Sequence, residues 1–358
     1  MYNSEMKTCI FCGQYPEAKT KEHVIPRWLI NLTGDSKRFA TFGYDLESKK
    51  AREFSFDRFQ FPACDQCNEK FSAMEEKSKQ IMLHLINNQP LNNESFSHLL
   101  TWFDKVRIGL WLGFLKLNKN KFGIEPNFHI QSGINRADRL LFIYRTSDIK
   151  DGINFFCVGT PSFDFAPVAF GFRINNYFFI NASATFLFSR RLGLPFSAEN
   201  YISDTHRGAV GIIQGGLERI ITPLIRGFRN IAGTEIYQPV AMRAMVHDKK
   251  YRTYYDNAYC KNFFALEESM LGKILINDSG NIIHYMDIAS DIWVPTVTLH
   301  KSDVYKHVAK GAIWFQNYFN NEMVNGDYLS GKYKRNYKKL MLIAKIVNRR
   351  LIEKLESD

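Results

Sequence analysis

The spacing of apolar residues changes several times along the chain, and each change predicts a different element of secondary structure. Residues 39–61 alternate large apolar side chains with polar ones, which is the period of paired β-strands. Elsewhere apolar residues recur at every third or fourth position, as they do in a helix with one buried face. On this basis helices are predicted for residues 27–30, 68–86, 95–118, 303–320 and 334–355.

Short apolar runs in the middle of the chain predict a sheet. Most of them lie between residues 125 and 190, two more follow residue 270, and the region from 190 to 240 is mixed. Each run is too short for a helix and has the length of a strand. The predicted strands are 140–144, 155–158, 166–173, 177–180, 273–276 and 292–294. Helices and strands that follow one another in this irregular order predict an α+β fold.

A polar stretch predicts the boundary between two parts of the chain. Residues 87–93 read Asn-Asn-Gln-Pro-Leu-Asn-Asn and interrupt two helical patterns. We therefore expect a first unit over residues 1–90 and a larger unit over residues 91–358, whose own pattern indicates no particular chemistry.

Composition excludes several classes of protein. The 358 residues are 45% hydrophobic, enough for buried cores and too many for a disordered chain. The most apolar run, Ile108–Leu117, is much shorter than the roughly 18 residues of a membrane-spanning helix. Lys7 and Cys9 stand where a signal peptide would be apolar. We expect a cytoplasmic protein with no membrane association.

Basic residues exceed acidic ones, and the excess is concentrated at the C-terminus. The chain has 47 Lys and Arg against 36 Asp and Glu, a net charge of +11, and residues 331–358 alone hold nine basic and three acidic side chains. The predicted helix 332–355 has an apolar stripe that we expect to dock on the core, formed by Leu340, Ile343, Val347, Leu351 and Leu355. Its basic face either meets solvent or follows a nucleic-acid backbone. The candidate nucleic-acid contacts are Lys338, Lys339, Arg349 and Arg350.

Four of the six cysteines form two C-x-x-C pairs. In a reducing compartment such pairs hold a metal more often than they form disulfides. Four thiolates suit the tetrahedral coordination of a structural zinc ion, and Gly13 would allow a tight turn after the first pair. The predicted zinc ligands are Cys9, Cys12, Cys64 and Cys67. The alternative is four ordinary buried cysteines.

A second motif lies between the two pairs. It reads Glu22-His23-Val24-Ile25-Pro26, and Asn68 follows the last cysteine. The order C-x-x-C, Glu-His-x-x-Pro, C-x-x-C-Asn resembles the HNH endonucleases, the zinc-containing branch of the ββα-metal nucleases. The resemblance covers about residues 7–80. It implies a zinc-stapled ββα-metal (HNH) module, followed here by a larger mixed α+β domain that ends in a basic helix.

The resemblance also implies a reaction, the hydrolysis of phosphodiester bonds. In the family pattern His23 is the general base, for which a neutral imidazole is suited near pH 7. Glu22 and Asn68 match the ligands of a catalytic Mg²⁺ or Mn²⁺, which neutralises charge on the phosphate. Glu75, seven residues after Asn68 and on the same helix face, is a further candidate ligand, or it orients His23. Arg27 is a candidate phosphate clamp.

The sequence departs from the family pattern at one position, and the motif poses one geometric problem. Phe59 stands where the family has a middle Asn that orients the histidine loop, so Asp57 or Gln60 would have to replace it, or activity would be reduced. Adjacent residues in a regular strand point to opposite faces, so Glu22 and His23 are expected where a strand ends or bends.

Ordinary roles also fit these residues. Asn68 is a favourable helix N-cap, Glu75 would commonly lie on a solvated helix face, and Trp28 and Leu29 would belong to the core.

Together these observations predict a metal-dependent endonuclease that acts on DNA, with restriction or anti-phage defence as its biological setting. The larger domain would choose the target. Two alternatives stay open at this point: a zinc-containing nucleic-acid-binding protein without catalysis, and an RNase or toxin effector gated by a partner. A homodimer, a regulatory protein and a small-molecule signal are also left open.

Overall fold

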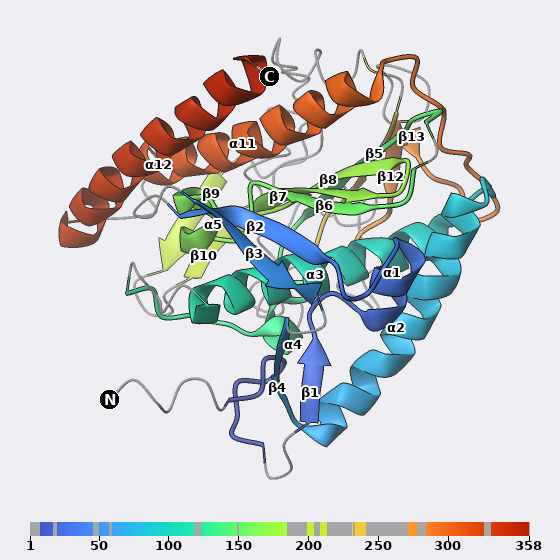
Figure 1. The fold of residues 1–358 in the computed structure, drawn as a ribbon. Coiled ribbons are helices and arrows are strands. Elements are labelled where there is room, and N and C mark those ends of the chain that lie inside the picture. Colours follow the sequence, from blue (N-terminus) through green and yellow to red (C-terminus); the bar gives the residue numbers. More distant parts are fainter. Residues whose placement is uncertain are drawn as a thin grey trace.

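A computed structural model shows a mixed helix-and-sheet protein, which agrees with the predicted combination of elements (Figure 1). The structure describes residues 8–16, 20–45, 50–56, 59–117, 123–148, 150–184, 199–203, 208–212, 231, 233–240, 271–277, 284–325 and 331–357. Its helices are α1 (Arg27–Leu32), α2 (Asp65–Ile86), α3 (Asn93–Leu117), α4 (Ile130–Gly133), α5 (Pro161–Phe165), α11 (Lys301–Asn325) and α12 (Gly331–Ser357). The helices predicted before and after the polar stretch at 87–93 and at the end of the chain are therefore present.

Within the described residues the strands form one large sheet and three smaller pairs. They are β1 (Thr20–His23), β2 (Phe39–Asp45), β3 (Lys50–Ser55), β4 (Gln60–Ala63), β5 (Arg139–Arg145), β6 (Ile153–Phe156), β7 (Ala169–Ile174), β8 (Tyr177–Ser183), β9 (Glu199–Ser203), β10 (Gly208–Ile212), β11 (Thr234–Gln238), β12 (Leu275–Asn277) and β13 (His284–Tyr285). The seven-stranded sheet has the order β13-β12-β11-β5-β8-β7-β6, and all of its neighbouring strands are antiparallel.

Helices cover both faces of this sheet, with α3 on one side and α11 and α12 on the other (Figure 1). Side chains alternate between the faces along each strand. The Phe103 ring of α3 contacts Phe170 and Phe179 on its side. On the opposite side Phe142 contacts Phe315 of α11. Burial on both faces explains why the central strands are apolar at nearly every position.

The N-terminal segment packs on the other side of α3. β1 and β4 pair antiparallel, with Glu22 opposite Phe61 and His23 opposite Gln60. Two glycines of α3 permit this close packing. A Cβ atom at Gly113 would lie 2.9 Å from the Phe61 ring, and one at Gly109 would lie 2.9 Å from Val24. The end of β1 is therefore held directly against α3.

One hydrophobic cluster joins the two predicted units. It contains Ile10 and Phe11 beside the first cysteine pair, residues of α2 and α3, and one face of the large sheet. A second cluster lies between the other face and α11. Residues 87–92 separate α2 from α3, as the polar pattern indicates, but the core is continuous across this break. The division into units of 1–90 and 91–358 stays a prediction.

The predicted strand at 292–294 is wrong. Ile292 makes a single bridge to Leu91, and no strand forms around it among the described residues. Val294 is buried in the core while the intervening Trp293 is 56% exposed. Pro295 follows directly and has no N–H to extend a ladder of hydrogen bonds. The apolar run at this point belongs to a loop that packs one side chain inward.

The predicted docking face of the C-terminal helix is confirmed at four of its five positions and is wrong at Ile343. α12 packs on α11 and α5 through Met341, Ala344 and Asn348, whereas Ile343 of the predicted stripe is 45% exposed. Small Ala344 allows close approach, and the Asn348 amide donates to Asn317 Oδ1 (2.8 Å) inside the contact. The partly buried members of the stripe are Leu340, Val347, Leu351 and Leu355. No helix in the described part of the chain is both long and apolar enough to cross a bilayer.

Candidate functional site

The two cysteine pairs come together at the N-terminal end of the molecule. The Sγ atoms of Cys9, Cys12, Cys64 and Cys67 all lie within 4.8 Å of one another, and those of Cys12 and Cys64 are 3.9 Å apart. Four sulfurs bound to zinc at about 2.3 Å in a tetrahedron would be about 3.8 Å apart. The cluster therefore has the donor atoms and the spacing to hold a zinc ion.

Backbone hydrogen bonds shape both halves of the cluster. In the first pair the N–H of Gly13 donates to the carbonyl of Cys9 (2.8 Å), and Gly13 adopts a positive φ of 79°. In the second pair Cys64 is the N-cap of α2, and its N–H donates to Cys9 Sγ (3.3 Å). The helix start thus fixes Asn68 one turn beyond the cluster.

The thiols influence one another's ionisation. Burial raises the pKa of Cys12, and burial with a neighbouring thiol raises the pKa of Cys67. Burial also opposes ionisation of Cys64, but hydrogen bonds from the backbone and the other thiols outweigh it and lower its pKa. Four thiolates at this separation repel one another unless a cation lies between them, which is the condition for a metal site.

Residues of the larger unit support this cluster. The N–H of Gln131 in α4 donates to the carbonyl of Phe11 (2.8 Å), and its side-chain oxygen lies 3.7 Å from Cys67 Sγ. The His129 ring covers Gly13 so closely that a Cβ there would lie 2.5 Å from it. Side chains around metal ligands orient them. Neither residue could be given a role from the sequence, because nothing in the local pattern links it to the cysteines.

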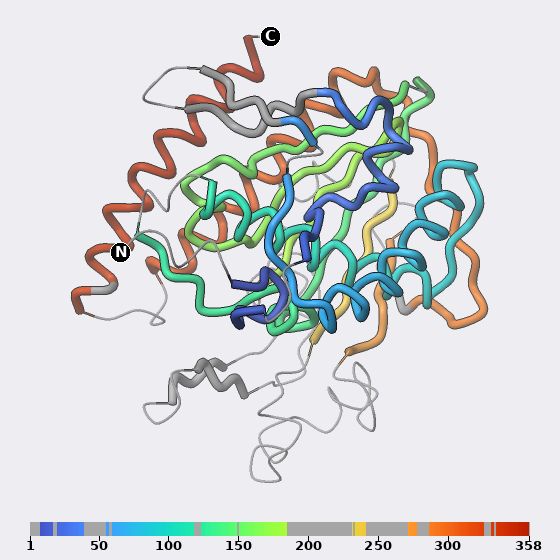
Figure 2. The backbone as a smooth tube through the Cα atoms, turned by 60° about the horizontal axis from the view of Figure 1, so that its bottom comes forward, coloured from blue at the N-terminus to red at the C-terminus, as the bar shows by residue number. Residues whose placement is uncertain are grey.

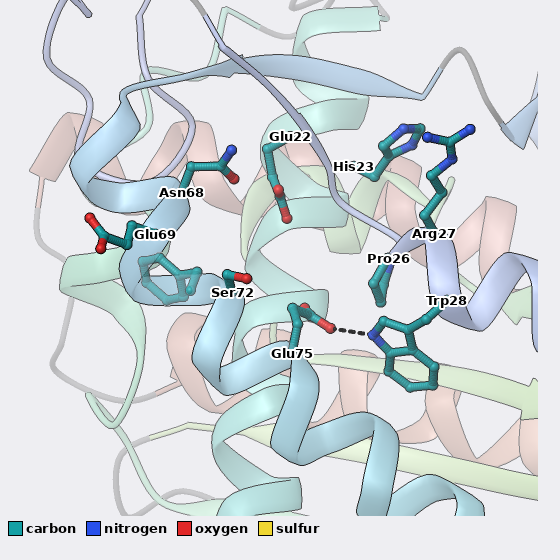
Figure 3. Close-up of a pocket in the computed structure, with 10 residues that line it drawn as sticks. Glu22, His23, Pro26, Arg27, Trp28, Asn68, Glu69, Ser72 and Glu75 are labelled. Atoms are coloured by element: carbon teal, nitrogen blue, oxygen red, sulfur yellow. Dashed lines mark hydrogen bonds between the residues drawn. The ribbon is translucent and has the colours of Figure 1, made fainter.

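A cavity of about 400 Å³ opens beside the cluster, between the end of β1 and the first two turns of α2 (Figure 3). It is lined by Glu22, His23, Pro26, Arg27, Trp28, Asn68, Glu69, Phe71, Ser72 and Glu75. The structure thus brings together the candidate base, the two candidate cation ligands, the candidate phosphate clamp and the further acidic candidate.

The basic residues of α12 are not part of this cavity. α12 and α2 lie on opposite sides of the molecule, as Figures 1 and 2 both show. Lys338, Lys339 and Arg350 are exposed, and Arg349 is also exposed but pairs with Glu353 (2.9 Å). Any contact that they make with nucleic acid is therefore separate from the cavity.

The end of β1 resolves the geometric problem of the adjacent pair. Glu22 points toward Asn68 and α2, while His23 lies on the other side of the chain beside Arg27 (Figure 3). β1 ends at His23, and Pro26 is the N-cap of α1. Because the strand stops there, both side chains border the same cavity from two sides.

Gln60 contacts the candidate base. Its amide nitrogen lies 2.8 Å from His23 Nε2, across the β1–β4 pair. Phe59, at the family position of the middle Asn, is 2% exposed and packs against Phe61 and Phe114. Of the two substitutes considered from the sequence, Gln60 therefore has the required contact, and Asp57 lies outside the described residues.

A buried lysine lies under the acidic side of the cavity. Lys105 of α3 is 0% exposed, and its Nζ is 2.8 Å from Glu22 Oε1 and 2.5 Å from Glu75 Oε1. Burial alone would lower the pKa of Lys105, but attraction to Glu75 and Glu22 outweighs it and raises the pKa. Lys105 therefore stays charged and compensates part of the negative charge of the two carboxylates.

Glu75 is buried rather than on a solvated helix face. Besides Lys105, it accepts hydrogen bonds from Trp28 Nε1 (3.0 Å) and Trp102 Nε1 (3.1 Å). The seven-residue spacing from Asn68 correctly indicated the shared face of α2. The only sequence signal for Lys105 is its place in a group of three charged residues, with Asp104 and Arg107, inside an otherwise apolar stretch of a predicted helix.

Comparison of this chain with protein-family models, with curated proteins and with solved structures found no match. The resemblance of residues 7–80 to HNH nucleases therefore rests on the motifs and on the geometry of the cavity.

Proposed function

We propose that the protein is a metal-dependent endonuclease of the HNH kind, which hydrolyses phosphodiester bonds in DNA at this cavity. One observation carries the proposal: Glu22 and His23 from one segment and Asn68 from a distant one line the same cavity. They do so next to a four-cysteine cluster that could hold zinc and that fixes the start of α2.

The residues on the acidic side fit a divalent cation. Glu22 uses one oxygen for Lys105 and is partly exposed to the cavity, and the Asn68 amide lies toward it (Figure 3). Hard oxygen donors of this kind suit Mg²⁺ or Mn²⁺, and Mg²⁺ commonly keeps several waters beside one or two protein ligands. Glu75 already accepts from three donors, so we assign it to the wall of the cavity and not to the cation.

The charges of the site suit a phosphodiester. Three carboxylates, those of Glu22, Glu69 and Glu75, stand against the positive charges of Arg27 and Lys105, which leaves one net negative charge with His23 neutral. One divalent cation would change the sign of that charge. The loaded cavity would then attract the single negative charge of a backbone phosphate.

Each side chain then has a role in the reaction. The cation would neutralise charge that builds on the phosphate and assist the leaving oxygen. His23 accepts a proton from the attacking water. Gln60, whose amide nitrogen lies 2.8 Å from Nε2, holds the imidazole in place from the neighbouring strand. Arg27 donates to phosphate oxygens that the cation does not hold.

Cleavage assays with a divalent-ion series test this proposal. Purified protein should cut plasmid DNA with Mg²⁺ or Mn²⁺ and not with EDTA, and the zinc content of the same sample is measured alongside. His23→Ala should abolish cleavage and leave zinc content and melting temperature unchanged. Retained cleavage in that variant would remove His23 from the role of base.

The same assay distinguishes the proposed DNA endonuclease from an enzyme that acts on RNA and from a non-catalytic binding protein. Binding that shifts DNA in a gel without cutting it in any divalent ion would favour the non-catalytic alternative. Cleavage of structured RNA in preference to plasmid would favour an RNase or a toxin effector. The larger unit would select the target in each case, and restriction or anti-phage defence is the setting we propose for DNA cleavage.

A further inference from the structure

Lys105 belongs to α3, outside the segment that resembles a nuclease, and pairs with two residues that line the cavity. Its ammonium group bridges Glu22, which borders the cavity, and Glu75, which forms the wall. We propose that Lys105 is a positioning residue: by holding Oε1 of Glu22, it directs Oε2 toward the cation. The inference rests on the proposed function of the same cavity.

The environment of Lys105 is built to hold the ammonium group in one place. Its side chain is 0% exposed, so no water competes for its donors. Glu75, on the far side, is itself fixed by the indole N–H groups of Trp28 and Trp102. The Phe11 ring, next to the cysteine cluster, lies 5.9 Å from Nζ. The two indoles therefore hold Glu75, Glu75 holds the ammonium group of Lys105, and that group holds Glu22.

This restraint determines how Glu22 can bind a cation. A free carboxylate can offer both oxygens to one ion, whereas a carboxylate with Oε1 on an ammonium group offers only one. A single oxygen from Glu22 leaves coordination positions for the Asn68 amide, for water and for phosphate, as the octahedral geometry of Mg²⁺ requires. The nearby positive charge also weakens cation binding. Lys105 thus favours a productive coordination geometry around the bound cation, and it lowers the affinity of the site for that cation.

A purely structural role for Lys105 makes a different prediction. Lys105 would then serve only to balance the buried charge of Glu75, and removing both together would restore a normal protein. The double variant Lys105→Met/Glu75→Gln removes one positive and one negative charge, so the net charge of the site is unchanged. The amide oxygen introduced by Glu75→Gln can still accept from the two indoles.

Mn²⁺ binding, followed by electron paramagnetic resonance without nucleic acid, is compared with plasmid cleavage for the wild type and the double variant. The double variant should keep its zinc and melt close to the wild type. It should bind Mn²⁺ about threefold more tightly or better, since both oxygens of Glu22 are then free to chelate while the net charge of the site is unchanged. Its kcat should be at least about tenfold lower with little change in KM for plasmid, because the cation is displaced.

Lys116→Met is the matched control, because Lys116 lies on the same helix away from the cavity and donates to the carbonyl of Thr8. It should leave Mn²⁺ affinity and turnover within about twofold of the wild type. Unchanged or weaker Mn²⁺ binding in the double variant, or turnover at the wild-type level, would overturn the assignment of Lys105. A wild type that cleaves no nucleic acid would overturn the proposed function, while the Mn²⁺ titration would still decide about Lys105.

Discussion

Gln60 and His23 face each other across β1 and β4, and the Gln60 amide nitrogen lies 2.8 Å from Nε2 of the imidazole. A side chain on a neighbouring strand thus contacts the His23 ring directly. Because a hydrogen bond to one ring nitrogen selects the tautomer, Gln60 determines which nitrogen of His23 is available for chemistry.

The first prediction concerns this contact. Gln60→Leu removes the hydrogen bond while nearly keeping the volume, and we expect turnover to fall by roughly 10- to 100-fold, since base catalysis contributes about 10²–10⁴. Gln60→Glu can only accept a hydrogen bond, so it cannot donate to Nε2 as the amide does, and it should also lose activity because it selects the opposite tautomer of His23. Plasmid cleavage rates at saturating Mg²⁺ measure both. Turnover at the wild-type level in the two variants would show that the contact does not orient His23.

The second prediction concerns the cysteine cluster. The wild type should contain one zinc per chain, and Cys12→Ser should lose most of it and melt at a much lower temperature. Binding of structural zinc is worth about 10 kcal/mol or more in small domains, and here the cluster shares a core with α2 and α3. Metal analysis and thermal melting measure the two effects. Cys157→Ser, which changes a thiol outside the cluster, should keep the zinc.

The third prediction concerns pH and His307 of α11. Burial lowers the pKa of His307 to about 4, and its Nε2 lies 3.1 Å from the hydroxyl of Tyr144. The unfolded chain takes up a proton here near pH 6.5, whereas the folded chain does not until near pH 4. Stability is therefore lost as the pH falls from about 6.5 toward 4, by about 2 kcal/mol between pH 7 and pH 5.

Urea unfolding at these two pH values, in the wild type and in His307→Gln, isolates this contribution. Gln does not titrate, so the variant should lose about 2 kcal/mol less than the wild type over the same interval. The same pH dependence in both proteins would contradict the assignment to His307.

The fourth prediction concerns the exposed basic face of α12. If Lys338, Lys339 and Arg350 contact backbone phosphates, replacing all three by Gln should weaken DNA binding and reduce the slope of log affinity against log salt by up to about 3. Cleavage of DNA once bound should not change, since α12 lies away from the cavity. Lys150→Gln, at an exposed site between β5 and β6, is the control. An unchanged salt slope would indicate that this face only meets solvent.

The parts of the site that depend on local spacing could be predicted from the sequence. Two C-x-x-C pairs imply a four-thiol cluster whatever lies between them, and the cluster then fixes the start of α2 and with it Asn68. The position of Glu75 on the same face followed from the helical period. These features could be predicted without knowing which helices and strands pack together.

The role of Lys105 could not be predicted in this way. Its partners Glu22 and Glu75 lie far from it in the sequence, and a lysine is ordinarily solvated. The face of α12 could be predicted in part. The helical spacing placed most of the apolar stripe against the core, but Ile343 is exposed, and the buried Ala344 and Asn348 are not large apolar residues that such a pattern singles out.

α3 holds two residues that line the cavity, through Lys105, and supports the large sheet, through Phe103. A shift of this helix that improved its packing against the sheet would also move Lys105 relative to Glu22, because a single helix carries both contacts. Residues 1–90 transplanted onto another protein would therefore supply the cysteines, the imidazole and the amide, but they would lack the Lys105 ammonium group that orients Glu22. A graft of this segment needs the helix that follows it.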